Sequence, residues 1–250
     1  MIDRTRISSI SGCVAVPYLA DCASKLRHEI VQPQRHGDAE VASRTAERNI
    51  ELELGSMARI VLVDHWMKIA FLVDDMFEDS EFRVPYDRLH AAGHQVEILG
   101  LERGKSVEGK KHEERIKVER AVSEVSARDY DALVIPGGYS PDRLRVNADA
   151  VRFTKEMAER EKPIAAVCHA PWMLIEAGLV KGRSITSWPS LKTDLINAGA
   201  RWVDKEVVVD GNLITSRKPD DLEAFSKALL QMLTQGVPER AAASDRATLH

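Results

Sequence analysis

A cysteine and a histidine stand side by side in this sequence, Cys168 and His169, immediately after the apolar run 164–167. A thiolate is a strong nucleophile, and a neighbouring imidazole can take up or return the thiol proton. If the run is a strand and a helix begins after it, the turn between them exposes Cys168 at the edge of a sheet. The unpaired N–H groups of that helix would favour the thiolate and lower the thiol pKa. The competing interpretation is an inert core cysteine beside a helix-capping histidine.

Two further segments that could do chemistry also follow apolar runs. Gly137 and Gly138 come after the run 132–135, and glycines at such a turn let backbone N–H groups approach a substrate carbonyl and stabilise an oxyanion. An ordinary turn is the alternative. The segment 74–81 follows the run 69–73 and contains five carboxylates. One of them, held beside the thiol, should have a raised pKa and donate a hydrogen bond to the thiolate, but the residues alone do not decide which.

The elements that would position these segments alternate between strand and helix. Apolar runs predict strands at 69–73, 95–99, 132–135, 164–167, 184–187, 206–209 and 212–215. Helical spacing predicts helices over 79–92, over 149–161, after His169 as far as Gly178, and from Pro219 to Gly236. This alternation predicts an α/β fold, a doubly wound, mostly parallel sheet with helices on both faces. The carboxyl ends of its strands share one edge, which would bring the three segments together.

The first quarter of the chain does not follow this pattern. Residues 1–66 carry short, inconsistent signals, and we expect an N-terminal extension that is disordered or lies upstream of the true start. Residues 67–234 are expected to form one domain of ordinary size, and 235–250 a flexible C-terminal tail.

The composition limits the class of protein. Hydrophobic residues make up 44% of the 250 residues and charged residues 30%, which excludes a disordered chain. The net charge of −4 gives no support to a nucleic-acid partner or an anionic membrane, and no apolar run is long enough to span a bilayer. Three cysteines are too few and too sparse for a disulfide framework. We therefore expect a cytoplasmic protein.

Two other motifs match known sites only in part. Gly104-Lys105-Ser106 resembles the end of a phosphate-binding loop, but only three residues separate Gly100 from that pair where the loop requires four. His112 begins like a zinc-peptidase helix, but Ile116 stands where the second histidine should be. We predict no metal site and no cofactor.

The motifs in their order along the chain resemble the ThiJ/PfpI superfamily, specifically the PfpI-type intracellular cysteine peptidases and their stress-protein relatives. The matching segments are Phe77-Glu78-Asp79, 131–138, 166–171, 197–211 and 215–217. The resemblance implies a flavodoxin-like fold of the class I glutamine-amidotransferase type. It also implies a homodimer or homohexamer with the active site near the interface.

The resemblance also assigns roles to residues. It makes Cys168 the nucleophile and His169 its partner, and it matches Glu78 to the glutamate that hydrogen-bonds the cysteine sulfur. Gly138 and the His169 backbone match the oxyanion-hole region, and Trp172 is expected to wall the pocket. Asp142 matches a carboxylate that completes the triad from a neighbouring subunit, and it is shorter than the glutamate of archaeal peptidase members.

Three functions are compatible with these residues. The first is a cysteine hydrolase acting on peptides, and the second is glyoxalase or deglycase chemistry on methylglyoxal-type adducts, in which the thiolate attacks a carbonyl. The third is a non-enzymatic role, a redox sensor or holdase chaperone in which Cys168 is oxidised rather than turned over.

Overall fold

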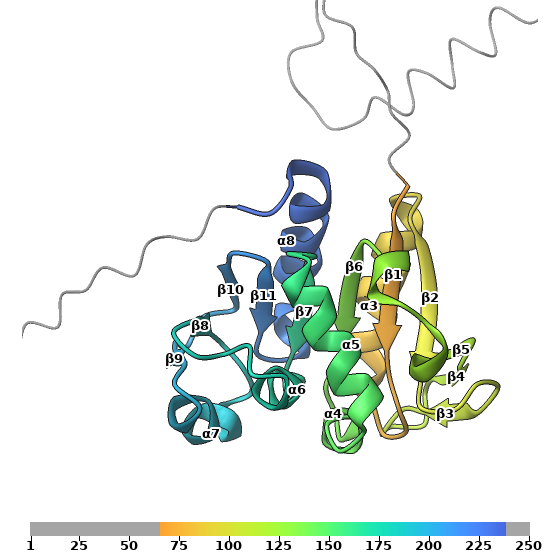
Figure 1. Ribbon diagram of the computed structural model, residues 1–250, viewed down its shortest axis with the longest axis horizontal. Helices are drawn as coiled ribbons and strands as arrows, with labels where there is room; N and C mark the ends of the chain where they lie inside the picture. The colour runs from red at the N-terminus through yellow and green to blue at the C-terminus, as the bar shows by residue number, and fades with distance from the viewer. Residues whose placement is uncertain (1–65, 239–250) are drawn as a thin grey trace, which may run out of the picture. The chain divides into compact units, whose positions relative to one another are not determined.

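The computed structural model describes residues 66–238 (Figure 1), so the expectations for 1–65 and for the tail beyond residue 238 lie outside the described residues. Within this range six of the predicted runs pair with one another and with a short strand that was not predicted, β5, into a central sheet of seven strands in the order β10-β11-β7-β6-β1-β2-β5. Their bounds are β1 Lys68–Leu72, β2 Gln95–Gly100, β5 Arg120–Ala121, β6 Ala132–Ile135, β7 Ile164–Val167, β10 Val207–Asp210 and β11 Leu213–Ser216. Every neighbouring pair is parallel except β10 with β11, which confirms the mostly parallel sheet.

Two small sheets flank the central one. β3 (Ser106–Glu108) pairs antiparallel with β4 (Arg115–Lys117), a hairpin that the sequence patterns did not predict. β8 (Ser184–Ile185) pairs with β9 (Arg201–Trp202), so the strand predicted at 184–187 is shorter and does not join the central sheet.

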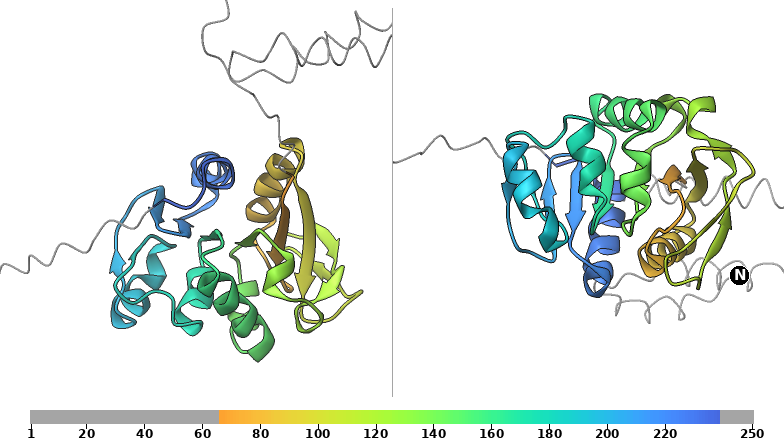
Figure 2. Two further views of the ribbon diagram at one scale, coloured as in Figure 1. Left: turned by 45° about the horizontal axis from the view of Figure 1, so that its top comes forward. Right: turned by 90° about the horizontal axis from the view of Figure 1, so that it is seen from below.

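The helices cover both faces of the sheet, as predicted. On one face lie α3 (Asp79–Ala91) and α8 (Leu222–Gln235), and on the other lie α4 (Ser140–Leu144), α5 (Ala148–Glu159), α6 (Pro171–Glu176) and α7 (Lys192–Asn197) (Figure 2). Side chains that alternate along the strands build the two halves of the core: Phe71 packs with the α3 and α8 side, and Leu72 with the α5 and α6 side.

Pro85 and Pro219 both lie in segments predicted to be helical. Pro85 lies inside α3, which begins at Asp79 and continues through the proline to Ala91. The last helix was predicted to begin at Pro219, but that residue opens a 3₁₀ turn, Pro219–Asp221, and α8 begins at Leu222. A tight first turn is common at helix N-termini, because it satisfies N–H groups that have no α-helical partner.

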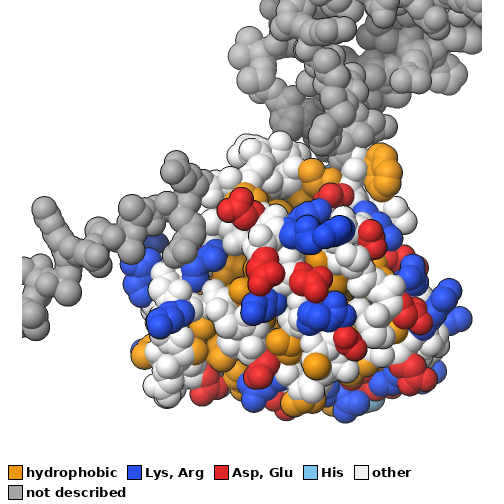
Figure 3. All heavy atoms as spheres, in the orientation of Figure 1, with side chains coloured by type: hydrophobic (Ala, Val, Ile, Leu, Met, Phe, Trp, Pro, Cys, Tyr) orange, Lys and Arg blue, Asp and Glu red, His pale blue; other side chains and the backbone are white. Residues whose placement is uncertain are grey.

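The surface carries charges of both signs. On the face shown in Figure 3, Lys and Arg side chains are interspersed with Asp and Glu. None of the helices in residues 66–238 is long and apolar enough to cross a membrane.

Candidate active site

Cys168 lies on a strained turn between β7 and α6. Its φ of 63° is in the left-handed region, which is uncommon for a residue with a side chain. The turn is fixed from two sides, because the Cys168 N–H donates to the Ser216 carbonyl (3.0 Å) and the Trp188 N–H donates to the Cys168 carbonyl (2.9 Å). Strain of this kind is typical of functional positions and aims the side chain at the carboxyl edge of the sheet.

His169 lies between the thiol and a serine. Its Nδ1 atom is 3.2 Å from Cys168 Sγ, and its Nε2 atom is 3.4 Å from the hydroxyl of Ser190. Burial, and secondarily the nearby Lys110 ammonium, lower the pKa of His169. The imidazole is therefore neutral near pH 7, and a neutral imidazole can accept the thiol proton.

A carboxyl does lie against the thiol, and it belongs to Glu81. Glu81 is in the first turn of α3, on the buried side of that helix with Phe82 and Pro85. Its Oε2 atom accepts a hydrogen bond from the Gly137 N–H (2.9 Å), and its carboxyl interacts with the Cys168 thiol. Burial, opposed by the Gly137 N–H and reinforced by the charge of Glu78, raises the pKa of Glu81 to about 8. This matches the expected raised pKa of a carboxyl beside the sulfur.

The assignment of that contact to Glu78 was wrong. The Glu78 carboxylate is buried but faces two lysines, with Oε2 at 2.6 Å from Lys110 Nζ and Oε1 at 2.9 Å from Lys111 Nζ. Burial alone would raise the pKa of Glu78, but these ion pairs outweigh it and hold the pKa below its usual range. The physical reason is the backbone: Glu78 is the N-cap residue of α3 and has an extended conformation (φ −77°, ψ 119°), so its side chain does not follow the helix face on which Glu81 is buried with Phe82 and Pro85.

The thiol pKa was also predicted in the wrong direction. Burial raises the pKa of the Cys168 thiol, and the Glu81 carboxyl raises it further. The Gly138 N–H and the Lys110 ammonium act in the opposite direction without reversing the shift. The α6 helix begins only at Pro171 and is six residues long, so its N-terminus does not outweigh the loss of water around the sulfur.

Gly137 packs directly against the Cys168 side chain, and Gly138 packs against the segment 76–78. A Cβ atom on Gly137 would lie 2.6 Å from both Cys168 Cβ and Glu81 Oε2. Gly138 has a φ of 77°, its N–H lowers the pKa of the Cys168 thiol, and a Cβ there would overlap the Met76 carbonyl. Gly137 is therefore required by the cysteine, and Gly138 by the segment 76–78 and by its own left-handed backbone.

Asp142 lies in α4 and contacts no residue of this site within the described part of the chain. Its side chain is 58% exposed and pairs with Arg145 Nε at 3.2 Å. The Arg145 guanidinium in turn lies 5.2 Å from the ring centroid of Trp172. An exposed Asp142 can reach a second molecule, so its action across an interface stays a prediction.

Two tryptophan rings flank His169. The Trp172 ring centroid lies 5.2 Å from that of the imidazole, and the Trp188 ring stacks against it at 6.2 Å. The Trp172 indole N–H donates to Asp194 (2.9 Å), which holds the ring in place. Trp172 and Trp188 thus both lie against the imidazole, and the role of Trp172 as a pocket wall stays a prediction.

Sequence reasoning missed Lys110, Trp188 and Ser190. Lys110 follows the short strand β3, whose three residues gave no strand signal. Trp188 and Ser190 follow β8, which was predicted as a strand, so a search of the loop after it would have found them.

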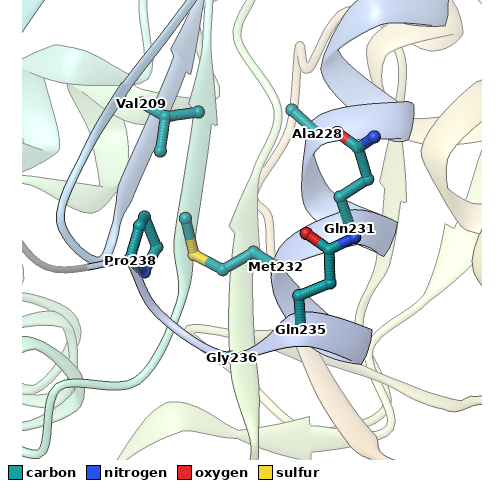
Figure 4. Close-up of a pocket in the computed structure, with 7 residues that line it drawn as sticks. All are labelled: Val209, Ala228, Gln231, Met232, Gln235, Gly236 and Pro238. Atoms are coloured by element: carbon teal, nitrogen blue, oxygen red, sulfur yellow. The ribbon is translucent and has the colours of Figure 1, made fainter.

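No group of three or more His, Cys, Asp or Glu side chains in residues 66–238 is arranged to hold a metal ion. A shallow pocket between β10 and the C-terminal half of α8, lined by Val209, Met232 and Pro238 among others (Figure 4), contains none of the residues described above.

Comparisons with known proteins agree with this architecture. The sequence profile of the DJ-1/PfpI family matches residues 67–232. YraA of Bacillus subtilis is 50% identical over 166 residues, which are 66% of this chain and 98% of that protein. The protein named Deglycase PfpI, of Pyrococcus furiosus, is 46% identical over 167 residues, which are 67% of this chain and 99% of that protein.

A solved structure shares the fold. It is a two-domain protein from Anabaena variabilis that contains DJ-1/ThiJ/PfpI-like and ferritin-like domains, and it matches with a TM-score of 0.67 and 40% sequence identity. The match covers 72% of this chain and 51% of that one, so this chain spans about half of the two-domain protein.

Proposed function

This chain belongs to the DJ-1/PfpI family, and from that premise we propose that it is a cysteine hydrolase of the stress-response kind with Cys168 as its nucleophile. The contact of Cys168 Sγ with His169 Nδ1 at 3.2 Å carries the proposal. A buried thiol with a raised pKa is protonated at rest, so it needs a base, and the neutral imidazole is in contact with it.

The remaining groups fit the later steps of such a reaction. When the imidazole takes the proton, the sulfur attacks a substrate carbonyl and an oxyanion forms. The N–H of Gly138, which lowers the pKa of the thiol, is a suitable donor to that oxyanion, together with the N–H of His169. Glu81 is mostly protonated at neutral pH, because its pKa is about 8, and can donate to the thiolate. With a methylglyoxal adduct the amine leaves as the sulfur takes its place on the carbon. The hemithioacetal on the sulfur then moves a proton between its two carbons to become a lactoyl thioester, which water hydrolyses to lactate and the free thiol.

We assign carbonyl-derived adducts, such as those of methylglyoxal, as the substrate class. The name of the Pyrococcus furiosus relative as a deglycase supports this choice. Attack by the same sulfur on an amide carbonyl would make the protein a peptidase, and a comparison of substrates distinguishes the two reactions.

The test compares initial rates on methylglyoxal, a glycated amino acid and casein under one set of conditions, with the Cys168→Ser variant as the blank. We expect turnover of methylglyoxal or the glycated amino acid above the blank. Cleavage of casein alone would replace the adduct chemistry by peptidase chemistry. If none of the three is processed, while wild type and variant protect an unfolding protein from aggregation equally, the protein is a chaperone rather than a hydrolase.

Asp142 is proposed to complete the site of a second copy of the chain by orienting its His169. Asp142→Asn should then lower kcat by roughly 10-fold, because the imidazole loses an orienting carboxylate. The matched control is Asp149→Asn, an exposed aspartate in a similar i,i+3 pair with Arg152 that should leave kcat unchanged. Light scattering gives the assembly, and a monomer with full activity would rule out action across an interface.

A further inference from the structure

Three consecutive residues at the start of α3 hold a loop from the β3–β4 hairpin. The carbonyl of Phe77 accepts the Lys110 N–H at 2.8 Å. The Asp79 carboxylate accepts three N–H groups of the same loop, from Lys111 (2.9 Å), Glu113 (3.0 Å) and Glu114 (2.9 Å). The loop lies so close that a Cβ atom on Gly109 would overlap the Asp79 carboxylate. The backbone on both sides of Lys110 is therefore fixed to this segment.

Glu78, between those two residues, holds the Lys110 side chain. The ion pair measures 2.6 Å, and the carboxylate is 1% exposed whereas the lysine is 35% exposed. Burial alone would lower the pKa of Lys110, but Glu78 reverses this, and the charges of Cys168 and Glu81 also raise it. The same segment also lies beside the thiol, because the Glu78 N–H donates to the Gly137 carbonyl (3.2 Å) and a Cβ atom on Gly137 would lie 2.6 Å from Cys168 Cβ. The ammonium held by Glu78 is therefore near the sulfur as well.

Apart from Lys110, none of the groups described around the thiol supplies a positive charge that could balance a thiolate. Glu81 and Glu78 of α3 are acids, and the His169 imidazole is neutral. The Gly138 N–H contributes only a dipole. Lys110 does supply a positive charge, and it lowers the pKa of the Cys168 thiol. It lies near the site because the hairpin loop is held against the start of α3.

We propose that the segment Phe77–Asp79 is a platform that holds Lys110 beside Cys168 and Glu81, where its ammonium balances the negative charge formed on the sulfur when the thiol loses its proton. This inference rests on the proposed role of Cys168 as the nucleophile. Glu78 and Lys110 are positioning residues in this scheme: Lys110 acts on the sulfur through its charge, and Glu78 acts through Lys110.

The test is the pH profile of Cys168 alkylation by iodoacetamide, read by mass spectrometry at the Cys168 peptide because the chain has two other cysteines. Lys110→Met should move the midpoint up by about one pH unit, because an opposite charge near an acid stabilises its ionised form. Lys110→Arg keeps the charge and should recover more than half of the shift. The control is Lys111→Met, which removes the other lysine paired with Glu78. The Lys111 side chain is 48% exposed, so its removal should shift the midpoint much less than Lys110→Met does.

The part played by Glu78 is tested by a double-mutant cycle. In a Glu78→Gln background, Lys110→Met should shift the midpoint by less than half as much, since the ammonium is no longer held at the thiol. An equal shift in both backgrounds would show that Glu78 does not position Lys110. An unchanged midpoint in Lys110→Met, with the protein folded by circular dichroism, would overturn the whole proposal.

The outcomes separate this proposal from the proposed function. Alkylation that depends on Lys110, in a protein that turns over none of the three substrates, would retain the platform and reject the hydrolase. If turnover depends on Cys168 but the midpoint of the alkylation profile is the same in Lys110→Met and wild type, the proposed hydrolase function is retained and the platform proposal is rejected.

Discussion

Replacing Cys168 with serine should lower kcat for the carbonyl substrate by roughly 10³-fold or more, the usual loss when a nucleophile is removed. A serine hydroxyl holds its proton far more tightly than a thiol. The base available to remove it is His169, whose pKa burial lowers below its ordinary value. The burial that raises the pKa of the Cys168 thiol would raise that of a hydroxyl in the same place as well, so this weakened base would remove the hydroxyl proton far less often than the thiol proton.

The experiment carries its own controls. Cys13→Ser and Cys22→Ser make the same chemical change elsewhere in the chain and should retain full turnover. Because serine is close to cysteine in size, the Cys168→Ser variant should unfold at nearly the same temperature as wild type. Full activity on every substrate in that variant would mean that Cys168 is not the nucleophile.

The second large effect is on stability, through the buried carboxyl of Glu81. The ordinary pKa of a glutamate is 4.5, and in the fold that of Glu81 is about 8. Between these values the folded state keeps a proton that the unfolded chain has lost, so the free energy of unfolding should fall as the pH rises through this window. The slope approaches about 1.4 kcal/mol per pH unit. Glu81→Gln removes this titrating group, so the free energy of unfolding of the variant should rise steadily relative to that of wild type from about pH 4.5 to pH 8.

Urea unfolding at pH 5, 7 and 9 measures that difference. Glu78→Gln is the matched control, because the pKa of Glu78 is shifted in the opposite direction. The ion pairs of Glu78 stabilise the fold above pH 4.5 and are lost on acidification, so this variant should be destabilised at neutral pH and approach wild type in acid. Stability curves for wild type and Glu81→Gln that run parallel from pH 5 to pH 9 would show that Glu81 titrates as it does in water.

Much of the fold could be predicted because its signals are local. A strand buried on both faces must be a continuous apolar run, and β1, β6 and β7 lie within a residue of their predicted bounds. The hairpin β3–β4 was missed because its strands have three residues each, and a single buried side chain in each gives no period to detect.

In the site, too, contacts between chain neighbours could be predicted, whereas contacts that depend on packing could not. Cys168 and His169 are neighbours in the chain, so their contact needed only the strand-to-helix turn. The choice between Glu78 and Glu81 depended on the residue at which α3 begins, because Glu78 has the extended backbone of an N-cap, whereas Glu81 lies inside the helix on its buried face. The direction of the thiol pKa depended on burial, which no local pattern shows.

By itself, the sequence determined the parallel sheet, the contact of Cys168 with His169 and the family, since these follow from backbone periodicity and from residues adjacent in the chain. Only the tertiary structure decided that Glu81 meets the thiol, that Glu78 instead holds Lys110, and that Ser190 lies at the far side of His169. Those contacts join segments between 21 and 87 residues apart in sequence, and the packing of helices and loops onto the sheet brings them together.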